Sequence, residues 1–165
     1  MQRSPASRRR SRVPRVACAL AGCGLVLLLP GAASAQRLEF SITPSAFVFP
    51  AADPDVTPVV MSPTLTIQYR VQQNVHGQWR LTVRADGDLT SGSASIPISN
   101  VTWNATPAPP FQNGTMSATV EQLIASGAGN VTPPETGSLT FQLVNSWNYA
   151  AGLYTQSFVF TLSAP

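Results

Sequence analysis

Few side chains of this 165-residue chain have the types and spacing that catalysis needs. His76 is the only histidine, and its position beside Gly77 in a polar segment is typical of a surface residue rather than of a general base. The chain has no lysine and no Gly-x-Ser-x-Gly motif, and a single histidine does not make a tetrahedral zinc site. The sequence therefore predicts a noncatalytic protein with no cofactor and no metal.

Two carboxylate pairs, Asp53 with Asp55 and Asp86 with Asp88, are the remaining candidate ligands for a cation. Their oxygen atoms would suit calcium if the two loops met. Neither pair follows the twelve-residue order of an EF-hand, and each brackets a proline or a glycine as turn residues do. The turn interpretation is favoured, and calcium binding stays open.

Aromatic side chains in or beside loops are better candidates for ligand binding. They are Trp103, Phe111, Trp147 and Tyr149. The segment Trp147-Asn148-Tyr149 combines flat apolar faces with an amide, which suits a sugar ring or a partner protein. The alternative is that these rings plug the end of a β-fold, because large aromatic side chains are usually buried.

The first 35 residues differ in composition from the rest. Six arginines and no acidic residue precede an apolar stretch at 16–29, and Ala33-Ser34-Ala35 follows, which is the order of a secretory signal peptide. The apolar stretch has 14 residues, fewer than the roughly 20 of a membrane-spanning helix. We therefore expect residues 1–35 to be a signal peptide, the mature protein to be secreted and no transmembrane segment to remain.

Leu20-Ala21-Gly22-Cys23 matches a lipoprotein box, but the apolar stretch continues after Cys23, so a lipid anchor there is not expected. Both cysteines, Cys18 and Cys23, precede the predicted cleavage, and residues 36–165 therefore have no disulfide. They carry four arginines and seven carboxylates, a net charge of −3. Nucleic-acid binding is not expected, because no basic cluster remains to replace counterions.

Alternation of apolar and polar residues predicts strands along residues 36–165. It is clearest at 79–85, where the apolar residues fall on the face of Trp79, so we expect this strand in the middle of a sheet with its indole buried. The strand at 65–71 is expected to form an antiparallel hairpin with it. Further strands are expected at 37–43, 96–103, 116–126, 138–145 and 153–162, with an edge segment at 56–61 because Pro58 lacks an amide hydrogen.

About eight strands and no long helix are the pattern of an all-β, antiparallel two-sheet sandwich of the Ig-like or Greek-key type. Residues 116–126 also fit helical spacing, but the glycines and prolines that follow favour a strand. We expect residues 36–165 to form a single domain. Tyr154, two residues after Gly152, is placed to anchor a corner through its hydroxyl.

Two segments of the chain resemble the WxL domain of secreted, cell-wall-associated bacterial proteins. One is Trp79-Arg80-Leu81, and the other is 151–165, in which a strand opens near Tyr154 and ends at Phe160-Thr161-Leu162. The resemblance implies a β-sandwich held noncovalently at the cell wall, with peptidoglycan as the ligand. Phe160 stands where the family has its second tryptophan, and a phenylalanine cannot supply an indole N–H.

We therefore expect a secreted, noncatalytic module of the bacterial cell surface or cell wall that binds peptidoglycan or another surface protein. The alternative is a pilus or coat subunit that donates residues 36–49 as a strand to its neighbour. A small secreted hydrolase is a third hypothesis, which the lack of a base or metal set disfavours. The Asn-x-Thr sequons at Asn100, Asn104, Asn113 and Asn130 leave N-glycosylation open.

Overall fold

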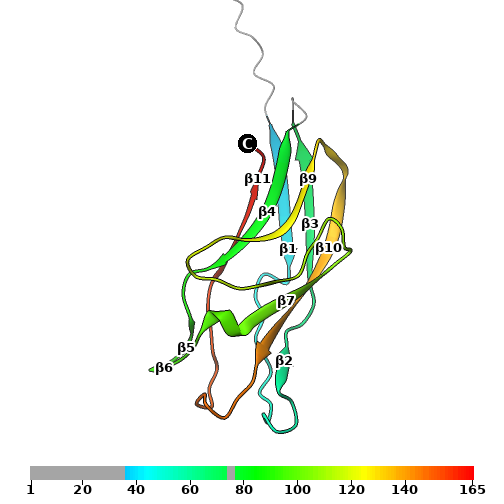
Figure 1. Ribbon diagram of the computed structural model, residues 1–165. Coiled ribbons are helices and arrows are strands. Elements are labelled where there is room, and N and C mark those ends of the chain that lie inside the picture. Colours follow the sequence, from blue (N-terminus) through cyan, green and yellow to red (C-terminus); the bar gives the residue numbers. More distant parts are fainter. Residues whose placement is uncertain (1–35, 74–76) are drawn as a thin grey trace, which may run out of the picture. The chain divides into compact units, whose positions relative to one another are not determined.

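The structure is a computed structural model that describes residues 36–73 and 77–165. The predicted signal peptide, including Cys23, and His76 lie outside these residues. The described residues contain eleven β-strands, no α-helix and one 3-10 turn at Ile98–Asn100 (Figure 1). The prediction of an all-β protein built from antiparallel sheets is confirmed. Among the described residues there is no helix of the length and hydropathy needed to cross a membrane.

The strands form two larger sheets and one short hairpin. The first sheet contains β1 (Arg37–Thr43), β2 (Val59–Met61), β3 (Leu65–Gln72), β7 (Val101–Thr106), β8 (Gly114–Thr115) and β10 (Val131–Val144). Its order is β1-β3-β10-β7-β8, and β2 also pairs with β10. The second sheet contains β4 (Gln78–Ala85), β9 (Gln122–Ala128) and β11 (Phe158–Ser163) in the order β11-β4-β9. The hairpin is formed by β5 (Leu89–Ser91) and β6 (Ala94–Ile96).

One hydrophobic core joins the two larger sheets. Tyr69 on β3 and Trp79 on β4 are both buried, and their ring centroids lie 4.9 Å apart. Trp79 is only 4% exposed, and β4 is the central strand of its sheet. The prediction that this strand lies in the middle of a sheet over a buried indole is therefore confirmed.

The predicted hairpin between residues 65–71 and the Trp79 strand is wrong. β3 pairs with β1 and β10, whereas β4 pairs with β11 and β9, so the two strands belong to different sheets. Alternation fixes which face of a strand is buried, and that face is buried in either arrangement. It does not fix the neighbouring strand.

Several boundaries also differ from the prediction. Residues 96–103 are divided by the 3-10 turn, near the point at Asn100 where the alternation changes phase. β9 begins at Gln122 rather than at 116, and β11 begins at Phe158 rather than at 153. β10 extends through Pro133 and Pro134, where its register with β3 shifts between Val131 and Glu135.

The first and last strands are edge strands of different sheets, and they lie beside each other without forming a ladder. The rings of Phe40 on β1 and Phe160 on β11 have centroids 6.1 Å apart. Gln36 Nε2 donates a hydrogen bond to the carbonyl oxygen of Ala164 at 2.6 Å. Side-chain contacts rather than backbone pairing therefore close this side of the core.

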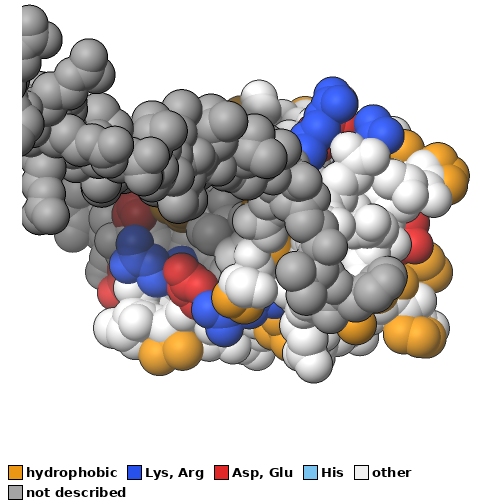
Figure 2. Space-filling view, turned by 90° about the horizontal axis from the view of Figure 1, so that it is seen from above, with side chains coloured by type: hydrophobic (Ala, Val, Ile, Leu, Met, Phe, Trp, Pro, Cys, Tyr) orange, Lys and Arg blue, Asp and Glu red, His pale blue; other side chains and the backbone are white. Residues whose placement is uncertain are grey.

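Three of the four arginines in the described part of the chain lie beside a carboxylate. Arg37 and Arg70 both pair with Glu39, the latter at 3.7 Å, and Arg84 pairs with Asp86 at 3.7 Å. Figure 2 shows basic and acidic side chains next to one another on the face that it draws. Exposed pairs of this kind contribute little to stability, on the order of 0 to 1 kcal/mol each.

Candidate functional site

A pocket of about 450 Å³ lies where the chain leaves β10. Its walls come from residues between Phe49 and Pro54, from Val60 and Ile96, and from most of residues 143–154. In Figure 1 the segments that precede β2 and follow β10 lie together at the lower end of the drawing. None of the described residues that line the pocket is Asp, Glu, Arg, Lys or His. The pocket is therefore apolar and uncharged, with amide and hydroxyl groups as its polar elements.

Trp147 is the most exposed aromatic residue of the pocket wall, with 68% of its surface accessible. Its Nε1 donates a hydrogen bond to Asp55 Oδ1 at 2.9 Å. Asp55 is positioned in turn by Asp53, whose Oδ1 accepts a hydrogen bond from the Asp55 amide at 2.9 Å. The indole is thus held by its edge, which leaves its apolar faces for a ligand.

Asn145 fastens the two sides of the pocket together. Its Nδ2 donates to the carbonyl oxygens of Ala52 at 3.1 Å and Thr57 at 3.0 Å, and its amide donates to the carbonyl of Pro58 at 2.8 Å. The loop before β2 is therefore fixed to the segment that carries Trp147. Hydrogen bonds from Asn145 therefore continue the connection between the two sides beyond the last ladder pair, Val144 with Val59.

Two tyrosines contribute further aromatic wall. Tyr149 is half-buried against the core, and its hydroxyl accepts a hydrogen bond from Asn100 Nδ2. The Tyr154 hydroxyl donates to the carbonyl oxygen of Ala150 at 2.8 Å, four residues upstream, as the corner prediction required. Because these hydroxyls already have protein partners, the tyrosines present mainly apolar ring surface to the pocket.

The structure brings Trp147 and Tyr149 together but places Trp103 and Phe111 elsewhere. Trp103 is 1% exposed, and its Nε1 donates to the carbonyl oxygen of Gln112 at 2.9 Å. Phe111 is 2% exposed and packs edge-on against Tyr69, with ring centroids 5.8 Å apart. Both are core residues of the folded protein, so the candidate site contains only two of the four aromatic residues that the sequence indicated.

The two segments that resemble the WxL domain lie on neighbouring strands. Leu81 of β4 is directly opposite Leu162 of β11, and Phe160 is opposite Val83. Trp79 and Leu81 are buried, whereas Phe160 and Leu162 are half-buried against the same core. Tyr154, from the same C-terminal segment, lines the pocket.

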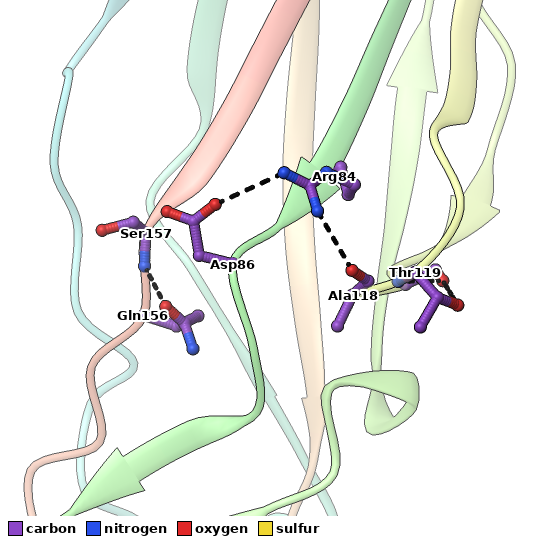
Figure 3. Close-up of polar contacts among 7 residues, drawn as sticks. Arg84, Asp86, Ala118, Thr119, Gln156 and Ser157 are labelled. Carbon is purple, nitrogen blue, oxygen red and sulfur yellow. Dashed lines mark hydrogen bonds and ion pairs between the residues drawn. The ribbon is translucent and has the colours of Figure 1, made fainter.

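All four carboxylates of the Asp53–Asp55 and Asp86–Asp88 pairs contact protein groups. Asp86 pairs with Arg84 (Figure 3), and its amide donates to the carbonyl oxygen of Ser157 at 3.1 Å. Asp88 Oδ1 accepts a hydrogen bond from the amide of Ile98 at 2.9 Å. These are the contacts expected of turn residues. No group of three or more His, Cys, Asp or Glu that would hold a metal is present in residues 36–73 and 77–165.

A second hollow of about 350 Å³ lies over β4 and β9. Arg80 and Glu121 line it, and Thr82 Oγ1 donates to Glu121 Oε2 at 3.1 Å. It is smaller than the first pocket and has no exposed aromatic face. The pocket at Trp147 is therefore the stronger candidate for ligand binding.

The non-aromatic residues that hold the pocket in shape were not predicted from the sequence. The sequence favours Asp55 as a turn residue, yet in the structure its carboxylate also orients Trp147. Asn145 is not among the binding residues that the sequence predicts. No sequence signal connects Phe49 with Leu143, because strand pairing and loop geometry bring these distant residues together.

Comparison of the sequence with protein-family models gives no match, and comparison with curated proteins gives none either.

Proposed function

We propose that this chain is a secreted, noncatalytic binding module of the bacterial cell surface or cell wall. The single observation that carries the proposal is Trp147, a tryptophan that is 68% exposed at an uncharged pocket and is held there by Asp55. Exposing so large an apolar ring costs hydrophobic free energy, so a fixed and exposed indole favours a ligand-binding role.

The proposed fold family is an Ig-like, Greek-key sandwich related to the WxL domain. Support comes from the two WxL-like segments, which pair as β4 and β11 and share the core with Tyr69. The proposed position of the binding site does not depend on the family. It depends on the loops that follow β1 and β10.

The proposed ligand is peptidoglycan, through its glycan chains. A sugar ring has one apolar face that stacks on an indole and hydroxyl groups that bond to amides and carbonyls. The pocket offers this combination in Trp147, Tyr149 and Asn145, without a charge among its described lining residues. Its volume of about 450 Å³ lies within the usual range of small-ligand sites.

The binding test uses the compact unit Ser34–Pro165, which contains every buried core residue of the described chain and is therefore expected to fold by itself. The purified unit is mixed with insoluble peptidoglycan, and the bound fraction is measured after sedimentation. Trp147→Ala should weaken binding about five- to thirtyfold, since a stacked aromatic ring is worth about 1 to 2 kcal/mol and each 1.4 kcal/mol is tenfold in affinity.

Val120→Ala is the matched control, because Val120 is 58% exposed and does not line the pocket. It should be retained as well as the unsubstituted unit. If Trp147→Ala were retained as well as Val120→Ala, the pocket at Trp147 would not be the binding site. Failure of the unsubstituted unit to exceed an unrelated β-protein would contradict wall binding as a whole.

Export is tested separately by expressing the full chain in a bacterial host and measuring the intact mass of the protein outside the cytoplasm. We expect a mature protein that begins at Gln36 and carries no lipid. A protein retained in the cytoplasm with residues 1–35 still attached would contradict this part of the proposal.

A further inference from the structure

The N-terminal arm, residues 36–49, contacts the core along its whole length but has backbone pairing only in its first half. Arg37–Thr43 is paired with β3 in unbroken register, from Arg37 opposite Gln72 to Thr43 opposite Thr66. Residues 44–49 form no strand. The inward side chains of the arm are all half-buried against the core: Leu38, Phe40, Ile42, Phe47 and Phe49.

The second half of the arm is held by aromatic contacts between the sheets. The ring of Phe47 stacks on Phe141 of β10, with centroids 5.3 Å apart and an interplanar angle of 11°. It also lies 5.9 Å from the ring of Phe158 on β11. Phe47 thus packs between two strands that belong to different sheets. Phe49, two residues further on, lines the pocket.

Residues 50–52 connect the arm to the rest of the fold. Neither these residues nor residues 44–49 of the arm make a backbone–backbone hydrogen bond with any described residue, and Pro50 has no amide hydrogen to donate. The connection is fixed again at Ala52, whose carbonyl oxygen accepts the hydrogen bond from Asn145. We call these three connecting residues, Pro50, Ala51 and Ala52, the hinge.

We infer that residues 36–49 exchange between two copies of this chain, so that each arm pairs with β3 of the other copy. The acceptor surface is the same in both copies, and every contact of the arm re-forms after exchange. The difference in free energy between two closed monomers and one exchanged dimer is then mainly the entropy lost when two chains come together. A tethered arm has an effective concentration on the order of millimolar, so exchange should compete only as the protein concentration approaches that level.

In an exchanged dimer, each arm would contribute a residue to the pocket of the other copy. The hinge of three residues spans at most roughly 10 Å, so the two copies must meet at the end where the pocket lies. Phe49 lines the pocket, and after exchange this ring comes from the second copy. Each pocket of the dimer would then contain residues of both chains. This inference does not rest on the proposed ligand.

A disulfide trap tests the exchange in the Ser34–Pro165 unit, which contains no cysteine. Ser41 and Gln68 are direct partners on β1 and β3, and both side chains are exposed. Directly opposite residues of an antiparallel pair lie within disulfide range. The unit with Ser41→Cys and Gln68→Cys is refolded and oxidised at micromolar and at millimolar concentration, then separated on a non-reducing gel.

We expect covalent monomer at micromolar concentration and a more than about hundredfold larger fraction of covalent dimer at millimolar concentration, as mass action requires. The matched control combines Gln68→Cys with Thr136→Cys, because Thr136 is the exposed β10 partner of Gln68 and does not exchange. It should give covalent monomer at both concentrations. Monomer alone in the first pair, or dimer in both pairs, would overturn the inference.

A second measurement needs no cysteine and applies if the double variants do not fold. Isotope-labelled and unlabelled units are refolded together at millimolar concentration, and mixed dimers are counted by native mass spectrometry. Phe40→Asp should remove the dimers because a charge at this core contact undocks the arm, and an undocked arm links no second copy. Val159→Asp, on the exposed face of β11, should leave them. Dimers that persist in Phe40→Asp would show an interface that does not involve the arm.

Discussion

Trp79 and Trp147 are the same residue type in opposite environments. Trp79 is 4% exposed between the two larger sheets, whereas Trp147 is 68% exposed at the pocket. The Trp79 side chain lies on an alternating strand, and the Trp147 side chain lies in a loop whose position depends on Asp55 and Asn145. The comparison indicates that this chain uses strand periodicity to build its core and side-chain hydrogen bonds to build its binding surface.

We name the surroundings of Trp79 the closed region, formed by Tyr69, Trp79, Phe111, Gly127 and Gly137. Tyr69 contacts both other rings, and the two glycines leave room for them. A Cβ atom added at Gly127 would lie 2.6 Å from Cζ2 of Trp79, closer than side chains approach in folded proteins. The pocket region, defined by the residues that line the pocket at Trp147, has no such complementarity and stays hollow.

The largest expected difference between the regions is in stability. Trp79→Ala removes a buried indole and leaves a cavity, so the free energy of unfolding should fall by about 3 to 5 kcal/mol. Trp147→Ala removes an exposed ring and should change it by no more than about 0.5 kcal/mol. Urea denaturation of the Ser34–Pro165 unit, followed by circular dichroism, measures both. Equal losses would contradict the distinction between the two regions.

The second expected effect concerns the space beside Trp79. Gly127→Ala should lower the free energy of unfolding by about 1 to 3 kcal/mol, because the new methyl group overlaps the indole. Ser126→Ala, at the neighbouring exposed position, is the control and should have little effect. In the Trp79→Ala background the methyl group enters the vacated space, so the cost of Gly127→Ala should disappear. An unchanged cost in that background would show that the substitution acts on the backbone and not through the ring.

The sequence predicts which faces of the strands are buried far better than it predicts the pocket. Residues 37–43 and the Trp79 strand were placed correctly, because one face of each strand is apolar at every second position. The predicted pairing of β3 with β4 was wrong, because the alternation of apolar and polar residues is the same in a hairpin and in a crossing between sheets. Asp55 and Trp147 are 92 residues apart in the sequence, and only the folded loops bring them within hydrogen-bond distance.

The four candidate aromatics show the same limit. Trp103 and Trp147 both lie beside loops in the sequence. Trp103 is nevertheless buried, because β7 pairs with the central strand β10 and points this side chain inward, with its ring 6.3 Å from Phe141. Trp147 follows the end of β10, beyond the last paired residue, where no second sheet covers it. Composition and spacing do not distinguish these two positions, but strand pairing does.

The smallest expected effect is a pH dependence that belongs to the closed region alone. Burial, followed by the hydrogen bond to Glu135 Oε2 at 2.6 Å and the charge of that carboxylate, raises the pKa of the Tyr69 phenol well above its usual range. The hydroxyls of Tyr149 and Tyr154 in the pocket region instead contact an amide and a backbone carbonyl. Tyr69 is therefore the phenol whose protonation should be coupled most strongly to folding.

The folded and unfolded states differ in how tightly they hold the Tyr69 proton, and this difference makes stability depend on pH. The unfolded chain releases the Tyr69 proton near pH 10, whereas the folded chain retains it, so this contribution to stability is complete below about pH 10 and is lost as the pH rises further. The free energy of unfolding should fall by up to about 1.4 kcal/mol per pH unit above that point. Urea denaturation over the alkaline range measures the slope, and lysine and cysteine, which are absent from the Ser34–Pro165 unit, do not titrate across it.

Two variants assign this slope to its cause. Tyr69→Phe has no phenol to ionise, so its stability should be lower at neutral pH but should change little between about pH 9 and about pH 11. Glu135→Gln keeps the buried phenol and removes the neighbouring charge, and it should retain most of the slope because burial is the larger cause. If Tyr69→Phe lost stability with pH as steeply as the unsubstituted unit, the buried phenol would not be the responsible group. The closed region would then resemble the pocket region in its response to pH.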